Sequence, residues 1–332
     1  MLTNNRVVKI LSVDGGGIRG IIPIVILQSL REILKEKNTN KPLYQLFDLM
    51  SGSSTGGLIS LALASPNPMT NEPMSLKELL NFYVNKSSYI FEGCQPKIYK
   101  VISSLFKAPI DPTRYEEQLF KIFGNETLKD LLTDVYITSL DIANFQTVNF
   151  NRIASHQLSH ENFYLRDVAR ATSAEPTLFP PAQVRCINKP LEYCLIDGGF
   201  YALNPSLNAY LYAKAKYPTA SKFVILSLGT GYSQMDIDCK EAEHWGLIDW
   251  ISPWNKIPAI QAFLRGQMSN TSDLLKYPDD VKLIRIQPTL TDEEDSVADT
   301  SEANIENLEK IGIKYAAKHE NQLNQIANYL IR

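Results

Sequence analysis

The chain has 332 residues, of which 44% are hydrophobic, 10% aromatic and 21% charged. This composition is typical of a folded globular protein and disfavours disorder or low-complexity function. The 33 Lys and Arg residues are slightly outnumbered by the 36 Asp and Glu residues, which gives a formal net charge of −3. A nucleic-acid partner is not expected, because proteins that bind nucleic acids carry a strongly basic surface.

A strand, a loop and a helix follow one another twice in the N-terminal part of the chain. Residues 7–13 form a β-branched run that stops at Asp14, and the helical spacing of Ile22, Ile26 and Leu30 predicts a helix beyond the glycine-rich loop. Residues 46–50 predict a second short strand. A Ser/Gly loop at 51–57 and an apolar helix at 58–64 follow it.

Later segments continue this alternation. Residues 135–140, 223–228 and 281–286 predict further strands, and residues 300–332 predict one or two closing helices. Alternating strands and helices predict a three-layer α/β/α fold with a mainly parallel central sheet. The sequence has no internal repeat and no long Gly/Ser/Pro linker, so we expect residues 1–332 to form a single domain.

The segment Gly52-Ser53-Ser54-Thr55-Gly56 matches the G-x-S-x-G nucleophile elbow. The predicted strand before it and the predicted helix after it are the context that this motif requires. Gly52 and Gly56 would let the strand and the helix approach closely, because they lack a Cβ. The helix N-terminus would favour the negative charge that forms during acyl transfer. The alternative is a Ser/Gly-rich turn without a catalytic role.

The segment Asp14-Gly15-Gly16-Gly17-Ile18-Arg19-Gly20 presents bare backbone N–H groups that could bind an anion. One candidate is a phosphate, because Gly15-x-Gly17-x-x-Gly20 matches the dinucleotide-binding fingerprint. However, the second strand ends in the serine motif where this fingerprint expects an acid. The other candidate is the oxyanion that forms when Ser54 attacks an ester. The carboxyl ends of adjacent parallel strands share one crevice, so a single site would explain both motifs.

A nucleophilic serine needs a general base, and the chain has four histidines, His156, His160, His244 and His319. A Ser, Asp, His order would require one of the last two, but both lie in polar helical sequence. The better candidate is Asp197, which ends a strand-like run before Gly198-Gly199. A carboxylate can act as the base where its surroundings raise its proton affinity. Otherwise Asp197 begins an ordinary Asp-Gly turn.

Three blocks, residues 14–20, 52–56 and 197–199, resemble in this order the signature blocks of the patatin-like phospholipases. The resemblance extends to residues 169–181, 226–231 and 300–304, so it covers nearly the whole chain. The elbow has Ser53 where plant patatins usually have Thr, and the third block is Asp-Gly-Gly rather than Asp-Gly-Ala. Neither departure affects the residues that carry the chemistry.

This resemblance implies a patatin-like variant of the α/β hydrolase fold with a Ser/Asp dyad. Ser54 would be the nucleophile and Asp197 the base. An oxyanion hole would be formed by Gly15, Gly16 and Gly17 with support from Arg19.

The implied reaction is hydrolysis of lipid acyl esters through an acyl-serine intermediate, with no metal or cofactor. It would be of the phospholipase A type, with galactolipase or lysophospholipase activity also open. Two alternatives remain: a storage or regulated binding protein of this fold with minor hydrolysis, and a dinucleotide-binding oxidoreductase.

The implied substrate is membrane or micellar lipid, met in transient contact, and a protein activator is compatible with the sequence. The segment from Lys97 to Lys107 mixes lysines with aromatic and aliphatic residues, so it is either an interfacial segment or an ordinary amphipathic helix. Trp250, Trp254 and Phe263 could line an acyl-chain channel or belong to the core.

The longest apolar stretch of interest, residues 21–27, is seven residues long. A membrane-spanning helix needs about 18. The first six residues lead directly into a strand, without the regions of a signal peptide. We therefore expect a cytoplasmic or unconventionally secreted protein that touches membranes during catalysis. The four cysteines, Cys94, Cys186, Cys194 and Cys239, have no metal-ligand spacing and are expected to be buried free thiols.

Overall fold

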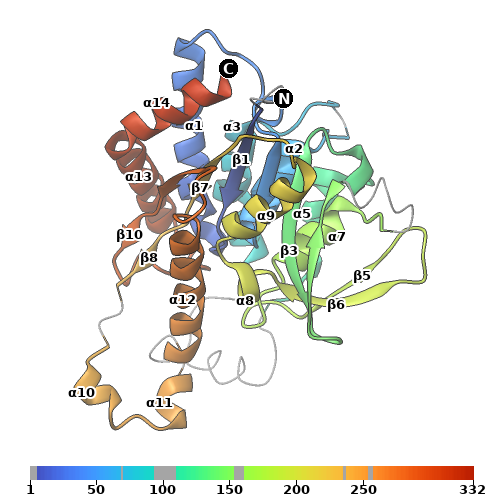
Figure 1. Ribbon diagram of the computed structural model, residues 1–332. Helices are drawn as coiled ribbons and strands as arrows, with labels where there is room; N and C mark the ends of the chain where they lie inside the picture. Colours follow the sequence, from blue (N-terminus) through green and yellow to red (C-terminus); the bar gives the residue numbers. More distant parts are fainter. Residues whose placement is uncertain (1–5, 69, 93–109, 153–160, 235–236, 253–256) are drawn as a thin grey trace.

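The computed structural model describes residues 6–68, 70–92, 110–152, 161–234, 237–252 and 257–332 (Figure 1). Its centre is an eight-stranded sheet with the order β5-β6-β3-β2-β1-β7-β9, and β4 pairs with β3 outside this path. The sheet strands are β1 (Val7–Val13), β2 (Leu49–Gly52), β3 (Asp134–Asp141), β4 (Gln146–Phe150), β5 (Ala182–Arg185), β6 (Glu192–Asp197), β7 (Lys222–Leu228) and β9 (Val281–Ile286). A separate parallel pair is formed by β8 (Tyr232–Ser233) and β10 (Thr289–Leu290).

The middle of the sheet is parallel. Strand β1 pairs in parallel with β2 and β7, β2 with β3, and β7 with β9. Strands β4 and β6 run antiparallel to β3, and β5 runs antiparallel to β6. The predicted mainly parallel sheet is confirmed. Strands β4 and β5 were not predicted, and the strand expected to end at Asp197 is β6, whose antiparallel direction was not predicted.

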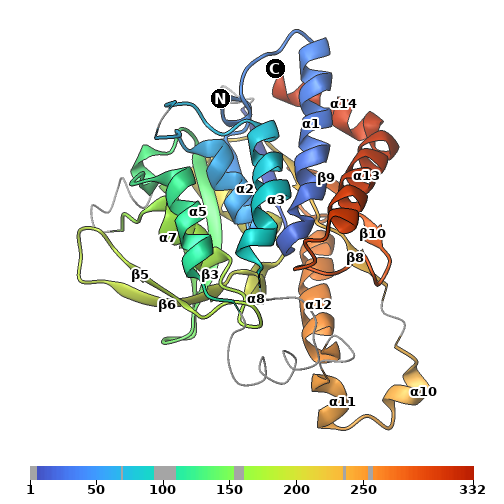
Figure 2. The same cartoon turned by 180° about the vertical axis from the view of Figure 1, so that it is seen from behind.

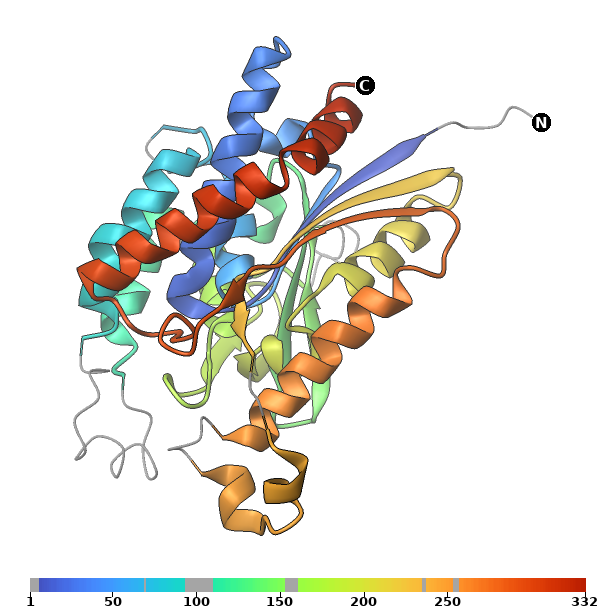
Figure 3. The ribbon, with the colours of Figure 1, turned by 90° about the vertical axis from the view of Figure 1, so that its left-hand side faces the viewer.

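Helices cover both faces of this sheet, which makes the three predicted layers (Figure 3). One face carries α1, α2, α3, α5, α7, α13 and α14, seen from outside in Figure 2. The other carries α9 and α12. The bounds are α1 (Ile21–Glu36), α2 (Thr55–Ala64), α3 (Leu76–Ile90), α5 (Thr113–Phe123), α7 (Leu165–Thr172), α8 (Gly199–Ala202), α9 (Ser206–Lys216), α10 (Cys239–Ala242), α11 (Leu247–Ile251), α12 (Pro258–Leu274), α13 (Glu302–Lys318) and α14 (Glu320–Leu330).

The sequence of β1 shows how the two layers of core arise. Side chains alternate across a strand, so Val8 and Ile10 pack in the core cluster that includes α9, while Leu11 and Val13 pack in the larger cluster that includes α1 and α2. Every residue of α2 is buried, which explains why its sequence is apolar on all sides.

The second strand lies later in the chain than predicted. Hydrophobicity placed it at residues 46–50, but Leu43–Gln45 form a short 3-10 helix and β2 spans Leu49–Gly52. Strand β2 continues through Ser51 and Gly52 because their backbones pair with β1 on one side and β3 on the other. The strand therefore runs directly into the serine motif.

No helix within the described ranges is both long and apolar enough to span a bilayer.

Candidate active site

Ser54 lies on the sharp turn between β2 and α2. Its backbone has φ 54° and ψ −125°, a conformation that costs energy for a residue with a Cβ and that is found at functional sites. A Cβ on Gly52 would lie 2.0 Å from the Gly56 carbonyl oxygen, and one on Gly56 would lie 2.1 Å from the Val13 carbonyl oxygen. The turn therefore needs both glycines. Between Leu49 and Ala64, Ser54 is the one residue that is not buried.

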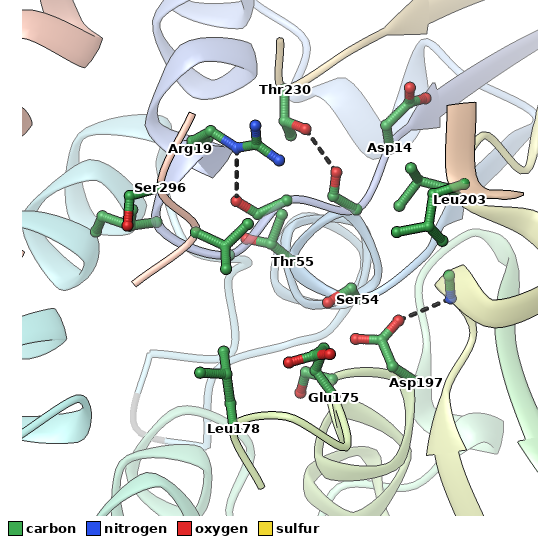
Figure 4. A pocket seen from close by; sticks show the side chains of 18 of the residues that line it. Asp14, Arg19, Ser54, Thr55, Glu175, Leu178, Asp197, Leu203, Thr230 and Ser296 are labelled. Atoms are coloured by element: carbon green, nitrogen blue, oxygen red, sulfur yellow. Dashed lines mark hydrogen bonds between the residues drawn. The ribbon is translucent and has the colours of Figure 1, made fainter. Parts of the chain in front are cut away.

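Asp197 reaches Ser54 because β2 and β6 share one edge of β3. At Ile137, strand β3 pairs with Gly52 of β2 along one edge and with β4 along the other. Strand β4 occupies its edge of β3 from residue 137 to residue 141. Strand β6 pairs with residues 139–141, so it must lie along the edge that β2 occupies. Strand β6 runs toward β2 and ends with Asp197 opposite Ser139. Two residues of β3, about 7 Å, separate the two strand ends. Ser54 and Asp197 lie next to each other in Figure 4.

Burial dominates the electrostatics of Asp197. It raises the pKa of this carboxyl from 3.8 to about 7, against the opposing effects of hydrogen bonds from the Ser54 hydroxyl and the Gly199 N–H, while the charge of Glu175 raises it further. The Gly199 N–H donates to Oδ1 at 2.7 Å. Oδ2 is buried and forms no hydrogen bond of standard geometry with any described residue. A free carboxylate oxygen beside a serine hydroxyl is an acceptor for the serine proton.

The glycine-rich loop lies against Ser54, since a Cβ on Gly15 would be 3.2 Å from the Ser54 Cβ. The Gly15 N–H already donates to the Leu203 carbonyl oxygen at 3.1 Å, so Gly15 is not available as the oxyanion donor that the sequence suggested. The N–H groups of Gly16 and Gly17 have no hydrogen-bond partner among the described residues. These two donors are open to a ligand.

Two side chains fix the direction of these donors by holding the carbonyl groups of the same peptides (Figure 4). The Thr230 hydroxyl donates to the Gly15 carbonyl oxygen at 2.5 Å, and the Arg19 Nε–H donates to the Gly16 carbonyl oxygen at 3.3 Å. In a trans peptide the C=O and the next N–H point in opposite directions. Thr230 therefore orients the Gly16 N–H, and Arg19 orients the Gly17 N–H.

Buried ion pairs anchor the loop from the C-terminal part of the chain. Arg285 of β9 pairs with both carboxylate oxygens of Asp14, one of them at 2.8 Å. Arg19 pairs with Asp295, which also accepts a hydrogen bond from Ser233. Burial raises the pKa of Asp14, and the charge of Arg285 opposes that rise. The strong pairing keeps a charged loop rigid in the protein interior.

An apolar cavity of about 520 Å³ opens onto Ser54 and Asp197. It lies within the range of about 300–1,000 Å³ that is usual for ligand sites. Its walls come from α3, from the segment after α7 and from α12, and their apolar side chains include Phe82, Ile90, Phe91, Leu178, Phe179, Ile260, Leu264 and Met268. Polar groups gather at the end where Ser54, Asp197, Glu175 and the glycine loop meet.

Several residues singled out from the sequence do not take part. His244 and His319 do not line the cavity, and His319 instead stacks on Tyr315 of α13. Trp250 and Phe263 do not line it either, and they are 36% and 53% exposed, so they belong neither to the cavity wall nor to the core. His156, His160, Trp254 and the segment from Lys97 to Lys107 lie outside the described residues.

Cys186, Cys194 and Cys239 are free, as expected. Cys186 is also buried as expected, but Cys194 is only partly buried and Cys239 is exposed, and Cys94 is not described. Within the described part of the chain, no group of three or more His, Cys, Asp or Glu side chains could hold a metal ion.

Sequence reasoning missed the residues that hold the site in place. Thr172 accepts the Ser54 N–H at 2.9 Å, and Thr230, Arg285 and Asp295 fix the glycine loop. Signals for three of them were present. Thr172 and Thr230 lie in the resembling segments 169–181 and 226–231, and Arg285 is a charge inside a strand that is otherwise mostly apolar. Asp295 stands in a sequence context without a comparable signal.

The mainly parallel sheet and the strand-turn-helix at Ser54 define a three-layer α/β protein related to the α/β hydrolases. Residues 11–223 match the family model of the patatin-like phospholipases. The chain is 32% identical over 343 residues to patatin-like protein 2 of Arabidopsis thaliana, covering 93% of this chain and 83% of that protein. It is 31% identical over 340 residues to patatin-like protein 2 of Oryza sativa subsp. indica, covering 92% and 83%.

The chain therefore belongs to the patatin-like phospholipase family and is, in this general sense, a lipid acyl hydrolase. Among solved structures, VipD from Legionella pneumophila matches with a TM-score of 0.42 and 13% identity, over 96% of this chain and 66% of that chain. The family model ends at residue 223, before Thr230, Arg285 and Asp295, which support the glycine loop.

Proposed function

We propose that the protein is a serine hydrolase of the phospholipase A type in which Ser54 is the nucleophile and Asp197 the general base. The observation that carries this proposal is the meeting of the partly buried Ser54 hydroxyl with the buried carboxyl of Asp197 at the polar end of an apolar cavity. No step requires a histidine.

The proton affinity of Asp197 suits this role. A base works best when its pKa is close to the working pH, and burial raises the pKa of Asp197 to about 7. An ordinary aspartate, with a pKa near 3.8, would be a much weaker acceptor. As Ser54 Oγ attacks the ester carbonyl carbon, Oδ2 takes the hydroxyl proton.

The N–H groups of Gly16 and Gly17 would stabilise the oxyanion of the tetrahedral intermediate. Donors held in place before the reaction need no reorganisation when the charge forms, and one such donor contributes about 2.7–4 kcal/mol. Thr230 and Arg19 provide this orientation, so Arg19 acts through the Gly16 peptide. The N-terminus of α2 adds a favourable dipole at Ser54.

The intermediate then collapses. The C–O bond to the alcohol breaks, the alcohol leaves with the proton held by Asp197, and the acyl group stays on Ser54 as an ester. Water next attacks the acyl-serine while Asp197 accepts its proton. Collapse of the second intermediate releases the fatty acid and returns the proton to Ser54.

The cavity favours a long acyl chain as the group that is transferred. Its aromatic and aliphatic walls would shield hydrocarbon from water, and each buried CH₂ group contributes about 0.8 kcal/mol. The natural source of such esters is membrane or micellar lipid, reached by transient contact with the aggregate.

The test is fatty-acid release from mixed phospholipid and galactolipid vesicles by the wild type, Ser54→Ala, Asp197→Asn and Ser53→Ala. We expect the first two variants to lose at least a hundredfold in rate. Ser53→Ala is the matched control, because Ser53 is the adjacent elbow serine and is buried. It should retain most activity.

Equal rates for Ser54→Ala and the wild type would remove Ser54 from the mechanism. A wild type without activity on any lipid would favour the storage or binding alternative. Activity that returns only on addition of a protein fraction would indicate an activator.

A further inference from the structure

Helix α11 carries apolar side chains that are exposed to solvent and packs against α12, which lines the cavity. Leu247 is 76% exposed, Ile248 79%, Ile251 51% and Trp250 36%. Leu247, Ile248 and Ile251 are spaced i, i+1 and i+4, so they share one side of the helix. We call these four residues the α11 surface. In Figure 1, α11 lies at the end of α12 that is farthest from the sheet.

Helix α12 connects this surface to the cavity. Helix α11 packs against α12, and α12 lines the cavity with Ile260, Leu264 and Met268, which recur at helical spacing. Hydrocarbon that reaches α11 would therefore lie one helix away from the apolar side of the site. Exposed apolar patches next to a ligand cavity are typical of interaction surfaces.

The aromatic residues of this segment point to a lipid interface. The chain has three tryptophans, Trp245, Trp250 and Trp254, and all of them fall within ten residues. The rings of Trp245 and Trp250 pack edge to face with centroids 5.2 Å apart. Tryptophan is enriched at membrane interfaces because its ring is apolar while its N–H remains a hydrogen-bond donor.

The charge of the segment selects among lipid surfaces. Residues 237–252 contain four acids, Asp238, Glu241, Glu243 and Asp249, against a single base, Lys240. Such a segment is repelled by anionic lipid. The charge pattern therefore fits a zwitterionic or neutral surface.

We propose that the α11 surface docks on zwitterionic or neutral lipid aggregates and places the cavity at the lipid–water boundary. This proposal rests on the proposed function in one respect, because the docked lipid would supply the ester that Ser54 attacks. A second copy of the chain is a less suitable occupant, because these four side chains cannot supply the roughly 800 Å² per partner that a stable protein interface buries.

Tryptophan emission tests the docking directly, since all three tryptophans of the chain lie within residues 245–254. The binding experiment uses the Ser54→Ala variant as the parent protein, so that the vesicles are not hydrolysed. The probe is a phosphatidylcholine vesicle. We expect a blue shift of the emission on addition of vesicles. Leu247→Ser/Ile248→Ser in the same background should weaken vesicle binding at least tenfold.

The matched control is Leu211→Ser/Ile313→Ser. These residues are 55% and 60% exposed but lie on α9 and α13, away from α11, so this variant should bind vesicles like the parent. Equal thermal unfolding of the two double variants would exclude misfolding as the cause of a difference. Added anionic lipid should weaken binding.

In otherwise wild-type protein, Leu247→Ser/Ile248→Ser should lower the ratio of vesicle hydrolysis to short soluble ester hydrolysis at least tenfold. Equal vesicle binding by the parent and this variant overturns the docking proposal. A blue shift that appears without vesicles and grows with protein concentration also overturns it, in favour of self-association. A failure of the Ser/Asp mechanism would instead appear as activity retained by Ser54→Ala, which leaves the vesicle-binding result unaffected.

Discussion

The buried carboxyl of Asp197 should make the protein less stable at alkaline pH, and Asp197→Asn should remove this cost. Burial raises the pKa of Asp197 from 3.8 to about 7 in the folded state. Between these values the folded protein holds a proton that the unfolded chain has released, so the free energy of unfolding falls as the pH rises. Asparagine carries no charge at any of these pH values.

The size of the effect follows from the shift. Each tenfold change in proton affinity corresponds to about 1.4 kcal/mol, so the full penalty above pH 7 is about 4 kcal/mol. At pH 5 Asp197 is protonated in the folded protein but ionised in the unfolded chain. This difference still lowers the free energy of unfolding by about 2 kcal/mol. The stability advantage of Asp197→Asn should therefore shrink by about 3 kcal/mol between pH 8 and pH 5, since the two pH units between 7 and 5 each correspond to about 1.4 kcal/mol.

Urea unfolding of both proteins at pH 8 and pH 5 measures this difference. Any constant effect of the new amide cancels, because it is present at both pH values, while Oδ1 keeps the hydrogen bond from Gly199. An advantage that is the same at both pH values, or larger at pH 5, would refute the reasoning. Asp197 would then be ionised in the folded protein well below pH 7.

The kcat/KM for an uncharged soluble ester should fall tenfold per pH unit below about 7, because protonated Asp197 cannot accept a proton; a flat profile down to pH 5 would contradict this. Gly17→Ala should lower kcat at least a hundredfold, because Gly17 has φ 58° and no room for a Cβ. Gly266→Ala, with nothing within 4 Å of the added Cβ, should keep the wild-type rate in the same assay. Arg285→Met should cost about 3–5 kcal/mol in urea unfolding by leaving Asp14 buried and unpaired, and Asp14→Asn in the same chain should restore part of this loss.

Local sequence patterns predicted the strands and the turn whose formation depends on residues that are close together in the chain. β-branched runs located β1, β7 and β9 closely, and the glycines of the elbow are required by the contacts that a Cβ would make. Strand β5 was missed because its sequence alternates with exposed polar positions, Gln183 and Arg185, and has no run of hydrophobic residues. The end of β6 at Asp197 was expected, but its antiparallel pairing with β3 and β5 was not.

Long-range pairing explains the rest of what was missed. Asp14 and Arg285 are 271 residues apart, and no spacing rule relates them. The Gly15 N–H was expected to be free because glycine loops usually present bare amides, but a carbonyl from Leu203 occupies it. Which amide of a loop is free depends on what packs against it.

The glycine-rich loop depends on Arg285, Asp295 and Val297, which are translated long after the loop itself. The Ile18 N–H donates to the Val297 carbonyl oxygen at 2.9 Å, and Asp14 and Arg19 find their ionic partners in the same late part of the chain. Ser54 leaves the ribosome early, but the peptides that would hold the oxyanion stay unsupported until these residues have emerged. Under the proposed mechanism, a nascent chain, or one cut short before Arg285, would carry Ser54 without a formed oxyanion hole. The cell's own lipids would thus be spared by a fragment of this protein.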